Sequence, residues 1–114
     1  MERDPNTFLF EIVKSCHNIA AFTKGIDIET YRVDPLIKSA VERQFIVIGE
    51  ALNRLKIVAP SIFESITDAG RIVGFRNILV HGYDIVSDEL VWEIISGYMP
   101  DLLSHCEKLL DERE

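Results

Sequence analysis

The sequence contains no apolar run long enough to cross a membrane, and its first four residues, Met-Glu-Arg-Asp, are mostly charged. A signal peptide needs an apolar segment close to the N-terminus, and this start offers none. These absences predict a cytoplasmic protein without membrane contact. Cys16 and Cys106 are too few for a disulfide framework, which is consistent with a reducing compartment.

Several motifs that would indicate other chemistries are also missing. There is no glycine-rich phosphate loop, no Gly-x-Ser-x-Gly elbow and no carboxylate cluster typical of a magnesium site. Nucleotide-driven phosphotransfer and two-metal nuclease chemistry are therefore disfavoured, and we expect neither a metal nor a cofactor. Cys16-His17 and His105-Cys106 contain zinc-type ligands, but both cysteines fall on apolar helical stripes, which predicts core cysteines.

No stretch alternates apolar and polar residues as a half-buried strand does; apolar residues instead recur at spacings of three and four. Asp4-Pro5 and Asp34-Pro35 each place an acidic N-cap before a proline at the first helical position, which predicts two helix starts. The first helix is expected to end at Gly25 and the second at Pro60. Gly49 lies inside the second, where either a close helix contact or a tolerated cost would explain it.

The second half of the chain continues the helical pattern. Ser61 is predicted to open a single turn as a capping box, and Ser87 to cap the last helix. Pro100 should kink that last helix because proline removes a backbone donor. Tyr31 is expected in a loop and Tyr98 at the edge of the core. Residues 1–114 are thus interpreted as one all-α domain, an antiparallel four-helix bundle whose third helix is short.

The most informative stretch is residues 71–83, RIVGFRNILVHGY, predicted to be a short helix from about Asp68. Gly82 is expected to end it in the left-handed conformation that glycine tolerates. His81 then lies in the last turn, where the helix dipole favours a protonated imidazole. Arg76, Asn77 and His81 are expected to share neighbouring surface, with Tyr83 folding back beside them.

The net charge of −7 disfavours indiscriminate binding to nucleic acid. The charge is unevenly spread, however: residues 38–76 hold six basic and four acidic side chains, whereas nine acidic and two basic side chains follow from Asp84 onward. An anionic ligand is therefore expected to bind the middle of the chain.

Arg76, then His81 after four intervening residues, then Tyr83, with Asn77 directly after the arginine, resembles the signature of the HepT-like members of the HEPN superfamily. Residues 40–44 and 48–51 are similar to the long second helix of that family. The resemblance implies an all-helical, metal-independent endoribonuclease whose site lies at a homodimer interface. It also implies the toxin of a type VII-like toxin–antitoxin pair, silenced by an MntA-like nucleotidyltransferase that adenylylates Tyr83.

The candidate residues suit RNA cleavage. His81 can transfer protons because imidazole titrates near neutrality, and Arg76 offers a phosphate a forked donor that stays charged. Asn77 could orient the histidine or hold a phosphate oxygen. One well-placed histidine is present where two proton transfers are needed, and a symmetric dimer would supply the second. AMP on Tyr83 is expected to place a phosphate near Arg76, in competition with RNA.

Two other functions remain open from the sequence alone. The chain could be a non-catalytic helical dimer that binds a nucleotide or a nucleotidyltransferase partner through the same surface. It could also be a structural four-helix adaptor in which Arg76 and His81 only cap a helix. RNA cleavage would separate the first hypothesis from both, and nucleotide binding would separate the two alternatives.

Overall fold

The computed structural model describes residues 4–113, and every regular element in that range is helical, which confirms the predicted all-α class. Long helices account for most of the chain, and three short ones join them. The long helices are α1 (Pro5–Thr23), α3 (Pro35–Val58), α5 (Ala69–His81), α6 (Asp88–Gly97) and α7 (Met99–Arg113). The short ones are α2 (Ile28–Arg32), α4 (Pro60–Ser65) and the 3-10 turn η1 (Tyr83–Ile85).

The helix starts predicted from the sequence are confirmed because they depend on local hydrogen bonds. The Asp4 carboxylate accepts from the backbone N–H of Asn6 at 2.9 Å. The carboxylate of Asp34 accepts from two backbone N–H groups at the start of α3, both at 3.1 Å. Ser87 accepts from the N–H of Leu90 at 3.1 Å and so caps α6. These bonds satisfy donors that a helix start leaves without partners.

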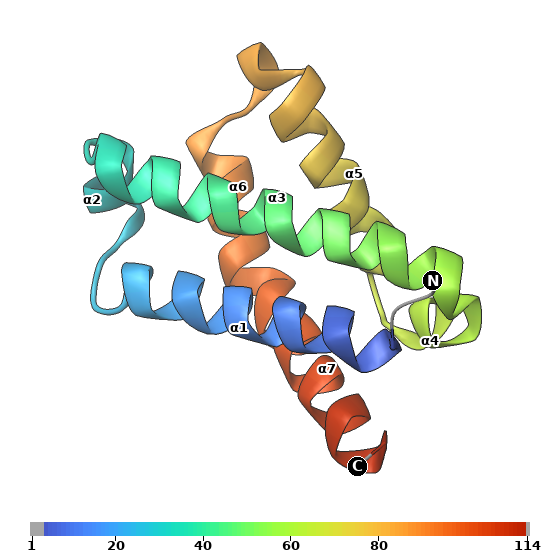
Figure 1. Ribbon diagram of the computed structural model, residues 1–114. Coiled ribbons are helices and arrows are strands. Elements are labelled where there is room, and N and C mark those ends of the chain that lie inside the picture. Colours follow the sequence, from blue (N-terminus) through green and yellow to red (C-terminus); the bar gives the residue numbers. More distant parts are fainter. Residues whose placement is uncertain (1–3, 114) are drawn as a thin grey trace.

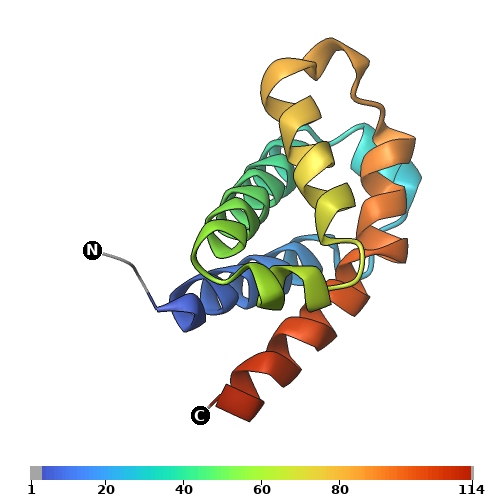
Figure 2. The same ribbon diagram turned by 90° about the vertical axis from the view of Figure 1, so that its right-hand side faces the viewer.

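Helix α3 is the centre of the arrangement. It lies beside α1 and also packs against α5, while α7 contacts α1 (Figure 1). Figure 2 shows that α5 and α6 run in opposite directions and are joined at one end through η1. One ring contact fixes the α3–α5 packing: the Phe45 and Phe75 ring centroids lie 5.2 Å apart in an edge-to-face arrangement. The motif helix is therefore positioned by α3.

The core contains both cysteines, as predicted. Cys16 on α1 and Cys106 on α7 are fully buried, and burial raises the pKa of both thiols. Their neighbour His17 is exposed, and its Nε2 lies 3.3 Å from an oxygen of Glu107. None of the helices described within residues 4–113 is long and apolar enough to span a membrane.

Three local predictions need correction. Tyr31 lies not in a loop but in α2, fully buried with its ring 5.5 Å from that of Trp92. Ser61 does not cap a turn, because α4 already begins at Pro60 and has no side-chain cap. The kink expected at Pro100 is a complete break at Tyr98, between α6 and α7.

Candidate active site

Helix α5 carries the motif, and one of its faces is buried. Ile72, Phe75 and Leu79 are buried, and the helix ends at His81, as predicted. Gly82 caps it through an N–H bond to the Ile78 carbonyl at 2.8 Å. The expected left-handed conformation is wrong, however, since Gly82 has φ −126°. The chain instead tightens directly into η1, which begins at Tyr83.

The Arg76 guanidinium is held on two sides. Its Nη1 donates to Oδ1 of Asn77 at 3.0 Å, and its Nη2 donates to Oε1 of Glu50 on α3 at 3.4 Å. The side chain is only 20% exposed, and its Nε is buried without a hydrogen-bond partner in the structure. The arginine and asparagine of the motif are therefore brought together, as the sequence predicted, and a carboxylate from a distant helix joins them.

Gly49 allows Arg76 to lie where it does. A Cβ built on Gly49 would overlap the Cβ and Cγ of Arg76. Gly49 is buried inside α3, where glycine is otherwise unfavourable by about 1 kcal/mol relative to alanine. Close approach of α5 is thus the reason for a glycine here, one of the two explanations that the sequence left open.

His81 points elsewhere. It is exposed in the last turn of α5, and among residues 4–113 its imidazole has no hydrogen-bond or ion-pair partner. At 3.6 residues per turn, five positions separate His81 from Arg76 by about 140° around the helix. Arg76 is turned towards α3, so the two side chains leave α5 in different directions.

Tyr83 is 62% exposed, and its hydroxyl lies near the Glu42 carboxylate on α3. Hydrogen bonding to this carboxylate is the main reason that the pKa of Tyr83 is raised, and the negative charge of Glu42 adds to it. Burial raises the pKa of Glu42, while the bond from Tyr83 and the charge of Lys38 act in the opposite direction. The phenol therefore remains protonated at neutral pH.

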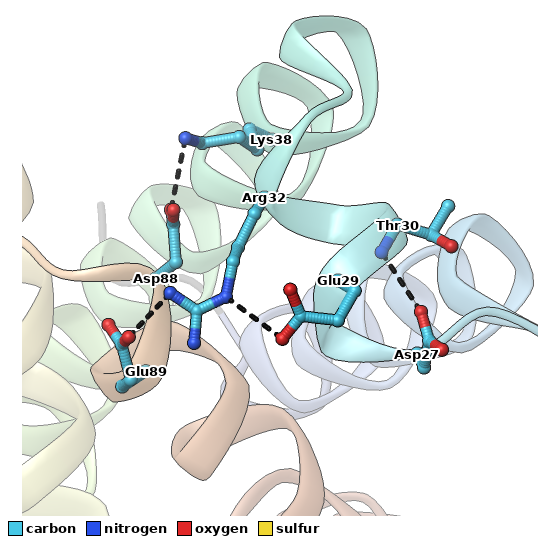
Figure 3. A network of polar contacts seen from close by, with 7 residues as sticks. All are labelled: Asp27, Glu29, Thr30, Arg32, Lys38, Asp88 and Glu89. Carbon is cyan, nitrogen blue, oxygen red and sulfur yellow. Dashed lines mark hydrogen bonds and ion pairs between the residues drawn. The ribbon is translucent and has the colours of Figure 1, made fainter.

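Tyr83 also borders a cavity of about 240 Å³ at the start of α3. Two basic residues, Arg32 and Lys38, line it, but both are already paired with carboxylates (Figure 3). Arg32 lies 2.6 Å from Glu89, and Lys38 lies 3.0 Å from Asp88. These ion pairs tie α2 and α3 to α6 and leave the surroundings of Tyr83 predominantly acidic.

The structure does not place the Tyr83 hydroxyl beside Arg76 within one chain. The two groups contact Glu42 and Glu50, eight residues apart on α3. At a rise of 1.5 Å per residue, these positions are about 12 Å apart along the helix. An AMP phosphate on Tyr83 would therefore adjoin Glu42 rather than the guanidinium of the same chain.

Sequence reasoning missed both carboxylates. Positions 42, 46, 49, 50 and 53 lie on one face of α3 by the three-and-four rule, so their shared direction was detectable. Periodicity alone could not show that this face lies against α5. Within residues 4–113, no group of three or more His, Cys, Asp or Glu side chains is gathered as a metal site would require.

This geometry can be compared with known proteins. The family described as "Ribonuclease HepT-like" matches residues 12–109, a range that contains α3, α5 and η1 entirely. The chain belongs to this family. The HepT-like assignment agrees with the resemblance seen in the motif, and it confirms the expected enzyme class, an endoribonuclease that acts on RNA.

Individual relatives are similar over nearly their whole lengths. Two carry the name "Putative RNase". MJ1380 of Methanocaldococcus jannaschii is 31% identical, with 93% of this chain and 96% of the relative covered. TTE0752 of Caldanaerobacter subterraneus is 29% identical, with 98% and 99% covered. "Probable ribonuclease HepT" of Thermococcus cleftensis is 27% identical, with 96% and 98% covered. No solved structure is significantly similar to the chain.

Proposed function

We propose that this HepT-like chain is a metal-independent endoribonuclease that acts as the toxin of a toxin–antitoxin pair. The observation that carries the proposal is the arrangement of Arg76, whose guanidinium is fixed by Glu50 and Asn77 on a helix that ends in an exposed histidine. A guanidinium held in place can bind a phosphate through two parallel hydrogen bonds. An imidazole without an internal partner is available to exchange protons with substrate.

The reaction consistent with these groups is an internal transfer at phosphorus. The ribose 2′-hydroxyl loses its proton to a base and attacks the adjacent phosphorus, and the bond from phosphorus to the 5′-oxygen breaks. That oxygen takes up a proton, so the products are a 2′,3′-cyclic phosphate and a 5′-hydroxyl end. In this scheme Arg76 stabilises the charge that develops on phosphorus, and His81 transfers protons. Asn77 holds the guanidinium in position.

A homodimer completes the scheme. Because Arg76 and His81 diverge around α5, one chain offers only part of a site, and a second chain would supply the second histidine. The outer surface of α5 is open at Gly70 and Gly74, where an added Cβ would meet nothing within 4 Å, so a second chain has room to approach it. A mainly apolar cleft of about 260 Å³ lies beside it, lined by Arg71, Gly74, Phe75, Ile78, Leu90 and Ile94.

Silencing by adenylylation is supported by the exposure of Tyr83. The sequence contains three tyrosines, and Tyr31 is fully buried. Tyr98 is partly buried, and its hydroxyl accepts a hydrogen bond from Arg71 at 2.9 Å. Tyr83 is therefore the tyrosine that a modifying nucleotidyltransferase of the MntA type can reach, and we assign the modification to it.

The test is RNA cleavage by the purified protein in excess EDTA. The variant His81→Ala should lose about 10²- to 10⁴-fold of the activity, because proton transfer is lost while the fold is kept. Arg76→Ala should be comparably impaired, and Arg76→Lys should recover little because lysine lacks the fork. His17→Ala, an exposed histidine on α1, is the matched control and should retain full activity. Near-normal cleavage by His81→Ala or Arg76→Ala would exclude the assignment.

A further inference from the structure

The contact between α3 and Arg76 involves two consecutive residues with different roles. Gly49 has no side chain, and the Cβ and Cγ of Arg76 occupy the space that one would fill. Glu50 extends from the next position and accepts a hydrogen bond from Nη2. Gly49 therefore contacts the aliphatic part of the arginine side chain, and Glu50, the next residue of the same helix, contacts its guanidinium.

We propose that Gly49 and Glu50 form a seat that positions Arg76 for RNA phosphate. The proposal rests on the proposed ribonuclease function, because it gives a role to residues that act through Arg76. Gly49 lets the arginine stem lie directly on α3, and Glu50 sets the direction of the guanidinium plane. Both are positioning residues and neither touches the substrate.

Arg76 keeps N–H donors that its contacts with Asn77 and Glu50 do not use. A guanidinium has five N–H groups. The bonds to Asn77 and Glu50 use one on each terminal nitrogen, and the N–H on Nε is buried without a partner. One N–H therefore remains on Nη1 and one on Nη2. These two are the donors that remain for a phosphate.

Exposure separates this role from a purely structural one. The side chain of Glu50 is 47% exposed, so its ion pair with Arg76 contributes little to stability. Loss of the carboxylate should thus leave the fold intact. It should nevertheless free a long side chain with many rotamers, so that its productive orientation is populated less often. The expected signature is a loss of turnover without a loss of stability.

The experiment measures steady-state cleavage of one RNA oligonucleotide, together with thermal unfolding, for Glu50→Ala and Glu50→Gln. Glu50→Ala should lower kcat about 10- to 100-fold with an unchanged Tm. Glu50→Gln keeps an acceptor oxygen and should recover part of that loss. Glu93→Gln, an exposed glutamate on α6, is the matched control and should resemble the unmodified protein. If the carboxylate only competes with RNA for Arg76, its removal lowers KM with kcat unchanged, and the seat is refuted.

A second pair of variants tests the coupling. In an Arg76→Lys background, Glu50→Ala should reduce kcat by far less than in the unmodified protein, because the fork it orients is already gone. Equal effects in both backgrounds would refute the seat. Arg76→Ala separates the seat from the proposed catalytic role of Arg76: an active Arg76→Ala protein overturns that catalytic role, whereas an inactive one beside fully active Glu50 variants overturns only the seat.

The Gly49→Ala variant provides an independent measurement. Its Cβ must displace the Arg76 stem, so kcat should fall even under conditions where circular dichroism shows a folded protein. Ala51 is a small residue near Gly49 on the same helix. The Ala51→Gly variant removes a methyl group instead of adding one, and it controls for a general weakening of α3. Normal kcat in a folded Gly49→Ala protein would contradict the role of Gly49.

Discussion

The Tyr83 hydroxyl, in the turn after the motif helix, lies near the Glu42 carboxylate of α3, and hydrogen bonding between the two is the main influence on the pKa of Tyr83. The bond raises the pKa of Tyr83, because an ionised acceptor favours the protonated phenol. Burial meanwhile raises the pKa of Glu42. The residue assigned to modification is thus held by a carboxylate that can also accept its proton.

Replacing Glu42 should change the titration of Tyr83 in a defined direction. In Glu42→Gln the acceptor is neutral, so the pKa of Tyr83 should fall towards the ordinary tyrosine value of about 10. The measurement is a pH titration of phenolate absorbance, with Tyr83→Phe subtracted to isolate this tyrosine. Glu93→Gln should leave the curve unchanged. An unaltered curve in Glu42→Gln would show that the bond does not control the phenol.

The same bond predicts how stability depends on alkaline pH. The pKa of Tyr83 is higher in the folded state than in the unfolded state, so its contribution is fully present below about pH 10. It is lost as the pH rises through the folded pKa. Urea unfolding across this range should therefore show an alkaline loss of stability that is smaller in Glu42→Gln. An equal loss of stability in both proteins would show that titratable groups other than Tyr83 cause it.

The contact between Phe45 and Phe75 should carry much of the attachment of α5 to α3. Phe45 is fully buried, so Phe45→Ala should lower the free energy of unfolding by about 3–5 kcal/mol. That is a large part of the total for a domain of this size. Urea denaturation followed by circular dichroism measures it. Phe10→Ala on α1 removes a ring that is 62% exposed and should change stability little; an equal loss there would contradict this account of the core.

Helix starts could be predicted from the sequence because their determinants lie within three residues. Asp4, Asp34 and Ser87 cap helices through bonds to their own neighbours, and the structure contains all three. The burial of Tyr31 could not be predicted in this way, since it depends on Trp92 on α6. In the sequence, Tyr31 appears only as a tyrosine between two helical stretches, with no sign of the distant helix that covers it.

In the candidate site too, contacts between residues close in sequence differ from contacts that depend on helix packing. Arg76 and Asn77 are adjacent in sequence and were expected on neighbouring surface, but the bond between them is seen only in the structure. Glu50 contributes through the packing of α3 on α5, which no local pattern specifies. The divergence of Arg76 from His81 was calculable from five positions at about 100° each, and it argues against a complete site in one chain.

A mixture of two inactive chains tests whether the site is shared. If a homodimer brings residues of both chains together, mixing Arg76→Ala with His81→Ala should restore a fraction of the cleavage, because one of the mixed sites keeps an intact arginine and histidine. The measurement is activity after the two purified variants are mixed and allowed to exchange. Sedimentation of the unmodified protein should show a dimer at micromolar concentration. A monomer that cleaves RNA at normal rates would exclude the shared site.

Adenylylation should occur on Tyr83 and should block cleavage without unfolding the protein. The phenol oxygen attacks the α-phosphorus of ATP, pyrophosphate leaves, and the phenol proton passes to a base. The product carries a nucleotide and a negative phosphate in place of the bond to Glu42, at a position about 12 Å along α3 from the partner of Arg76. We therefore expect the bulk of the nucleotide at the end of α5, rather than pairing with Arg76 of the same chain, to exclude RNA.

Intact-mass analysis after co-expression with a nucleotidyltransferase of the MntA type, followed by peptide mapping, measures the modification. The unmodified sequence should gain one AMP, and the Tyr83→Phe variant should gain none. The Tyr98→Phe variant should still gain one, because the Tyr98 hydroxyl is bonded to Arg71 and is not the site of modification. Modified protein should lose cleavage while its Tm stays close to that of the unmodified protein. Tyr83→Phe should fold, cleave RNA and resist silencing. AMP found on Tyr31 or Tyr98, or no adduct at all, would end the silencing hypothesis and leave the catalytic roles of His81 and Arg76 to be judged on their own variants.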